Sequence, residues 1–109
     1  MHDGGAAMKI IQELSEHIEE EIHDAECYAK MAIHYHETEP EAAELFFTLS
    51  KEEMQHMAKL HHEAADLITK YRKEHGEPPE SMMAVYNYLH DKSMEHAAQV
   101  RQLQGMYNA

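Results

Sequence analysis

The stretch from Leu49 to Leu60, LSKEEMQHMAKL, places Glu53 and His56 three residues apart. Residues at this spacing project from the same side of a helix, so the two side chains could chelate one metal ion. Carboxylate oxygen combined with imidazole nitrogen suits iron, manganese or zinc, whereas copper(I) prefers sulfur ligands. The spacing therefore indicates a candidate metal site on this segment.

A further carboxylate, Glu21, lies on an apolar stripe in the preceding segment. The apolar positions alternate by fours and threes, as on one face of a helix, and Glu21 fills the one vacancy. They are Leu14, Ile18, Ala25, Tyr28, Ala32 and Tyr35. An ionised carboxylate in an apolar interior protonates, pairs with a cation or binds a metal. Because the segment ELSEHIEEEIHDAE holds seven acids and no Lys or Arg, a metal ion is the simplest partner.

A second Glu-x-x-His match, formed by Glu20 and His23, competes with this assignment. These two residues fall roughly 100° or more from Glu21 on a helical wheel. We therefore expect Glu20 and His23 to be a solvated surface pair.

Glycine and proline residues divide the chain into three predicted helices, at residues 8–37, 39–75 and 79–107, within one domain of residues 1–109. Residues 1–7 are expected to form a flexible N-terminus. Thr38 followed by Glu41 matches a capping box for the second helix, and Gly76 is expected to end it. Since a short turn between long helices predicts an antiparallel hairpin, the expected fold is all-α, a long two-helix hairpin plus a third C-terminal helix.

The second and third predicted helices also carry apolar stripes. That of the second helix comprises Ala42, Leu45, Leu49, Leu60 and Leu67, with Glu53 and His56 between them. That of the third comprises Met82, Tyr86, Leu89, Val100 and Leu103, with His96 midway between the last two leucines. A histidine in this position is more often a hydrogen-bonded core residue than a ligand, but His96 could add a nitrogen to the metal or to a second site.

The number of candidate ligands points to a dimer. Di-iron carboxylate bundles use one Glu from each of two helices and one Glu-x-x-His from each of the other two. This chain offers Glu21 once and the pair Glu53 and His56 once, which is half of that set. Two chains related by a twofold axis would complete it, so we expect a homodimer or higher homo-oligomer that forms a four-helix bundle on dimerisation.

At this point the chain resembles the ferritin-like superfamily, and most closely the encapsulated ferritins, which carry half a four-helix bundle per chain. The resemblance lies in the stretches IEEEIHDAECYAKMA and LSKEEMQHMAKLHH and covers residues 8–74. In both stretches the family's ligand positions coincide with Glu21, Glu53 and His56. Tyr28, seven residues after Glu21, matches a tyrosine of rubrerythrin-like proteins.

The resemblance implies a ferroxidase that binds two Fe(II) ions between subunits and oxidises them with oxygen or peroxide, for iron storage or detoxification. It implies that Glu21 bridges the metals, that Glu53 binds through its carboxylate, and that His56 binds through one ring nitrogen. Zinc, manganese or calcium could take the place of iron. For Tyr28, a role beside the ligands and a role as a packed aromatic residue are equally open.

Several features depart from the family or border the stripe. The long C-terminal stretch does not resemble an encapsulin-targeting peptide, so an encapsulin shell partner is not supported. His17, one turn before Glu21, is a weaker candidate for an accessory site. Glu20, Asp24 and Glu52 form either a solvated acidic face or a surface that attracts Fe(II).

The charge balance limits the partners. The chain has 21 Asp and Glu against 9 Lys and Arg, which disfavours nucleic acid and anionic membrane surfaces as partners and favours cations. No stretch has the length of a membrane span, and Cys27 is the only cysteine. We expect a cytoplasmic protein, and the resemblance adds a protein nanocompartment as an alternative location.

Two alternatives to an enzyme remain open at this level. The first is a non-redox protein that binds or stores iron, zinc or manganese, which the 11 His and 9 Met residues favour. The second is a purely structural helical oligomer in which Glu21 and Glu53 pair with lysine or arginine. This last alternative is the weakest, because no Lys or Arg occupies the apolar stripe.

Overall fold

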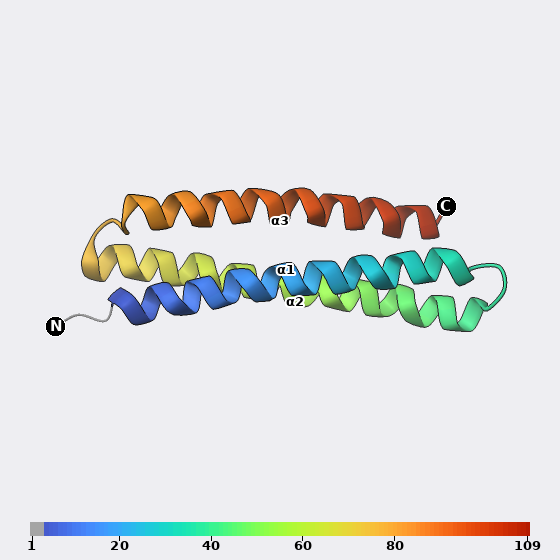
Figure 1. The fold of residues 1–109 in the computed structure, drawn as a ribbon. Helices are drawn as coiled ribbons and strands as arrows, with labels where there is room; N and C mark the ends of the chain where they lie inside the picture. The colour runs from blue at the N-terminus through green and yellow to red at the C-terminus, as the bar shows by residue number, and fades with distance from the viewer. Residues whose placement is uncertain (1–3) are drawn as a thin grey trace.

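A computed structural model describes residues 4–109, which form three long helices: α1 (Gly4–Tyr35), α2 (Pro40–His75) and α3 (Glu80–Tyr107). As predicted, the fold is all-α. Helices α1 and α2 form an antiparallel hairpin and α3 runs alongside it, giving a rod of 60 × 19 × 15 Å (Figure 1). Among residues 4–109, no helix combines the length and hydrophobicity that a membrane crossing requires.

The first helix starts earlier than the sequence predicted. Residues 1–3 lie outside the described part of the chain, but residues 4–7, expected to be flexible, form the first turn of α1. Ala6 and Ala7 have the highest helix propensity of any residue type, which offsets the two glycines before them. The helix ends at Tyr35, two residues before the predicted boundary.

The predicted capping box at the start of α2 does not form. The residue that caps the helix is Glu39, not Thr38, and no side-chain hydrogen bond accompanies it. Pro40 occupies the first helical position and keeps the residue before it out of the helical conformation, so α2 begins one residue later than expected. At the other end the prediction is confirmed, because Gly76 ends α2 with a φ of 81°.

The core of the hairpin includes Ile18, Ala25 and Ala32 of the stripe predicted for α1 but lies beside the stripe predicted for α2. The buried apolar residues of α1 and α2 are Ile11, Ile18, Ile22, Ala25, Ala29, Ala32, Ala43, Phe47, Met54, Met57, Ala64, Ile68 and Tyr71. Leu49, Leu60 and Leu67 are only half-buried, and Leu45 is 56 % exposed. Glu21 and the α2 stripe that carries Glu53 therefore lie on a flanking face of the hairpin, which a single chain leaves partly uncovered.

Helix α3 packs mainly along α1 and has fewer contacts with α2. It buries Ala97 and Val100 against a cluster that includes Ile22 and Met57. A buried serine ties the three helices together: Ser50 Oγ donates a 2.7 Å hydrogen bond to the Ala25 carbonyl and accepts one of 2.9 Å from Gln104 Nε2.

Candidate metal centre

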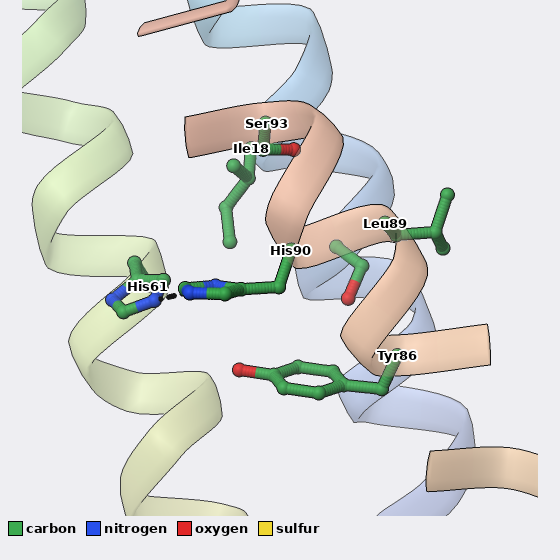
Figure 2. Close-up of a pocket in the computed structure, with 7 residues that line it drawn as sticks. Ile18, His61, Tyr86, Leu89, His90 and Ser93 are labelled. Carbon is green, nitrogen blue, oxygen red and sulfur yellow. Dashed lines mark hydrogen bonds between the residues drawn. The ribbon is translucent and has the colours of Figure 1, made fainter. Parts of the chain in front are cut away.

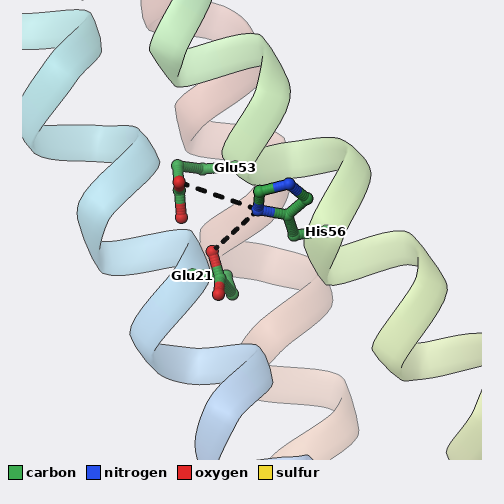
Figure 3. A group of neighbouring side chains, drawn as sticks. All are labelled: Glu21, Glu53 and His56. Carbon is green, nitrogen blue, oxygen red and sulfur yellow. Dashed lines mark ion pairs between the residues drawn. The ribbon is translucent and has the colours of Figure 1, made fainter.

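Glu21 from α1 and Glu53 and His56 from α2 converge on one point of the hairpin. Each offers one ligand atom, and these three atoms lie within 4.8 Å of one another. His56 Nδ1 lies 3.6 Å from Glu21 Oε2 and 3.7 Å from Glu53 Oε1. In Figure 3 the three side chains stand on the near face of the hairpin while α3 lies behind it. The centre is thus on the face that α3 leaves uncovered.

The packing of the hairpin positions each ligand. Glu21 directly precedes Ile22, which is fully buried, while Glu53 and His56 directly precede the buried residues Met54 and Met57. Successive residues on a helix are about 100° apart, so each ligand is held at the edge of the interface by its buried neighbour. The Glu21 and Glu53 side chains are 25 % and 20 % exposed, and that of His56 is 54 % exposed.

The two carboxylates are close enough for Glu21 to affect the pKa of Glu53. The pKa of Glu53 is raised from 4.5 to about 7, because its neutral carboxyl group can hydrogen-bond to Glu21, because burial disfavours its charge, and because Glu21 is negative. The charge of His56 opposes this rise and that of Asp24 adds to it. Near neutral pH Glu53 is therefore partly protonated, and a cation could displace the proton.

The donor set fits a divalent cation. Glu21 Oε2 is buried and has no hydrogen-bond partner, which is unfavourable for a carboxylate oxygen. A cation among the three side chains would satisfy this oxygen and offset the repulsion between the carboxylates. Two carboxylates and an imidazole suit iron, manganese or zinc.

His96 lies away from this centre. Its Nε2 is 3.0 Å from Glu26 Oε1 and its Nδ1 is 3.5 Å from Glu19 Oε2, so it joins α3 to α1. The hydrogen bond from His96 is the main reason why the pKa of Glu26 is lowered. The structure therefore does not place a nitrogen of His96 at the centre formed by Glu21, Glu53 and His56.

The other accessory candidates lie on the surface or beside the centre. His17 and Glu20 form an exposed pair with 3.2 Å between Nδ1 and Oε2, and Glu52 is exposed. His23 is exposed too, with its Nε2 3.8 Å from Cys27 Sγ. Glu20 and His23 thus face solvent, as predicted.

Tyr28 is half-buried on the hairpin, where its ring stacks on Phe46 with a centroid distance of 6.3 Å. This contact gives Tyr28 the packing role that the sequence left open.

The polar contacts that His96 and His90 of α3 make with the other helices were not predicted from the sequence. Glu19 and Glu26 meet His96, and their seven-residue separation on one helix face was the available signal. His61 meets His90 across α2 and α3. His61 lies seven residues from both Met54 and Ile68, which are buried, so the core periodicity of α2 could have singled it out.

Comparisons with protein-family models, with curated proteins and with solved structures find no match for this chain. The resemblance to ferritin-like proteins therefore depends on the two quoted stretches, and the function has to be inferred from the geometry of the site.

Proposed function

We propose that this chain is a ferritin-like iron-binding protein that oxidises Fe(II) to Fe(III) at a site containing Glu21, Glu53 and His56. The observation that carries the proposal is the convergence of these three donors on an uncovered face of the hairpin, with a buried carboxylate oxygen that has no hydrogen-bond partner. Glu21 and Glu53 both have His56 as their ion-pair partner and not a lysine or arginine, which argues against a purely structural role.

The proposal includes a second copy of the chain. The uncovered face carries a row of half-buried or exposed leucines on both sides of the ligands: Leu14, Leu45, Leu49, Leu60 and Leu67. A twofold axis through this face would bury these leucines and bring four carboxylates and two imidazoles together, enough for two iron ions. The two hairpins would then form a four-helix bundle, with each α3 on its outside.

Each side chain has a distinct part in the proposed reaction. Glu21 and Glu53 neutralise the charge of the bound iron, and Glu53 releases its proton as the ion binds. His56 binds through the Nδ1 lone pair, which it offers when it is neutral. The iron supplies the electrons: two Fe(II) ions lose one electron each, and dioxygen takes up both electrons with two protons to give hydrogen peroxide.

Anaerobic titration with Fe(II), with the molar mass followed by light scattering, tests the proposal. We expect saturation near one iron per chain, coupled dimerisation, and rapid Fe(III) absorbance on admission of air. Glu53→Gln should lose rapid oxidation, whereas Glu63→Gln, an exposed carboxylate on the same helix, should not. Failure of the unaltered protein to bind Fe(II) would overturn the proposal.

A non-redox metal-binding function is the second candidate. It is favoured by the fact that one chain alone brings three donors together, which is the number of protein ligands in many zinc sites with an open position. The same titration separates the two functions. Binding of one ion per chain without dimerisation and without oxygen consumption would select the non-redox function.

A further inference from the structure

A pair of histidines joins α2 to α3 on the side of the hairpin that α3 covers. His61 Nε2 and His90 Nδ1 are 2.9 Å apart, and the two rings are tilted by 30° with their centroids 4.6 Å apart. Figure 2 shows the two rings meeting across the gap between the helices, beside a small cavity. Helix α3 has few contacts with α2, and this pair is one of the side-chain links between them, together with Gln104 to Ser50 and Tyr107 to Glu44.

The hydrogen bond between the rings contains a single proton. One of the two nitrogens donates it, and the other accepts it with a lone pair. If the donating ring takes its other tautomer, so that the proton leaves this nitrogen and the other ring nitrogen gains one, both rings stay neutral and both lone pairs point into the same small region. Two imidazole nitrogens bound to one tetrahedral zinc ion stand roughly 3.3 Å apart, given metal–nitrogen bonds of about 2.0–2.1 Å. The observed separation of 2.9 Å is only a few tenths of an ångström shorter.

The surroundings keep these nitrogens available to a cation. The pKa of His61 is lowered by burial and, in addition, by the charges of His90 and His62, so His61 is neutral near pH 7. From α3, the phenol ring of Tyr86 lies nearly parallel to the His90 ring, with a centroid distance of 6.1 Å. From α1, the cavity is lined by Ser15 and Ile18, which carry no charge.

We propose that His61 and His90 form a second metal site, a two-imidazole clamp for a borderline divalent cation such as Zn²⁺ or Cu²⁺, that fastens α3 to α2. Water completes the coordination. Nitrogen ligands without carboxylates favour these ions over Fe(II), so the clamp differs in metal preference from the centre at Glu21, Glu53 and His56. The proposal does not depend on the proposed iron oxidation.

Calorimetric titration with Zn²⁺ tests the clamp in the metal-free Glu53→Gln/His56→Gln protein, which lacks two of the three ligands of the other centre. His61→Gln and His90→Asn each place an amide near the replaced nitrogen, so hydrogen bonding is retained while the metal-binding lone pair is lost. The matched control is His62→Gln, because the His62 side chain is 79 % exposed and pairs with Asp66.

We expect the Glu53→Gln/His56→Gln protein to bind Zn²⁺ and to unfold at a higher temperature with it. His61→Gln and His90→Asn should each weaken zinc binding at least about tenfold and abolish the rise in unfolding temperature. His62→Gln should change neither. Equal loss in all three variants, or unchanged binding in the first two, would assign the zinc to surface histidines and overturn the proposal, as would an absence of binding.

A spectroscopic measurement keeps the proposal testable if a variant fails to fold. Cu²⁺ added at one equivalent to the Glu53→Gln/His56→Gln protein should give an electron paramagnetic resonance spectrum with two imidazole nitrogens. A spectrum with oxygen ligands only, or with one nitrogen, would overturn the clamp.

Discussion

Replacement of Glu53 by glutamine should stabilise the metal-free protein at high pH. A carboxyl pKa of about 7 in place of 4.5 means that folding disfavours the ionised side chain by up to about 3 kcal/mol. Because the side chain is 20 % exposed and water screens its charge, we expect an effect of about 1–2 kcal/mol. Glutamine carries no charge, and its amide can still donate a hydrogen bond to Glu21.

The pH dependence has a definite sign. Well below pH 4.5, the Glu53 carboxyl group is neutral in the folded and the unfolded chain and has little effect. As the pH rises from 4.5 to about 7, the unfolded chain loses the proton first, so the stability of the native protein falls. Glu53→Gln lacks this fall, and the two proteins should differ most above about pH 7.5.

Urea unfolding followed by circular dichroism measures this difference, with a chelator present and at two protein concentrations so that association is detected. Glu63→Gln serves as the control for removal of one charge from α2. If Glu53→Gln is no more stable than Glu63→Gln at high pH, the explanation of the raised pKa is wrong. With anaerobic Fe(II), Glu63→Gln should become the more stable of the two variants. It keeps Glu53, and iron at a hundred times its dissociation constant stabilises a protein that binds it by about 2.7 kcal/mol.

Three other perturbations test the fold. Because the pKa of His61 is lowered from 6.5, the unfolded chain binds a proton at a higher pH than the folded chain does. The stability should therefore fall as the pH falls below 6.5, and it should fall less in His61→Gln; urea unfolding measures both. Ser50→Ala removes two hydrogen bonds in the core and should lower the free energy of unfolding by about 1–3 kcal/mol; an unchanged value would contradict the role assigned to Ser50. Gly76→Ala places a side chain at a φ of 81° and a ψ of −162° and should destabilise the protein by about 1–3 kcal/mol. Gly105→Ala inside α3 places a side chain in open space and should stabilise the protein by up to about 1 kcal/mol. Thermal unfolding measures both effects. Equal effects at the two glycines would refute the backbone argument.

The number of helices and the stop at Gly76 were predictable, because glycine and proline punctuation is a local signal. The start of α2 was misread because two local signals competed, and the constraint that Pro40 places on Glu39 prevailed over a capping box at Thr38. The face that α1 buries was harder to assign, since Ile22 and Glu21 are neighbours and both adjoining faces carry apolar residues.

The sequence placed Glu21, Glu53 and His56 on facing helices of a hairpin, and the structure brings them together. Their spacing within α2 and the short turn after α1 made this predictable. The partners of His96 and His61 were not, because they depend on how α3 is rotated about its own axis when it packs. That rotation is fixed by contacts between residues far apart in the sequence.

Alanines fill much of the interface between α1 and α2, with Ala25, Ala29, Ala32, Ala43 and Ala64 fully buried. Such small side chains allow the two helices to approach closely, while larger side chains such as Ile22, Met54 and Ile68 are buried beside them. A slide of one turn, about 5.4 Å, would separate Glu21 from Glu53 and His56. A cation held by all three would therefore also hold the two long helices in a single alignment.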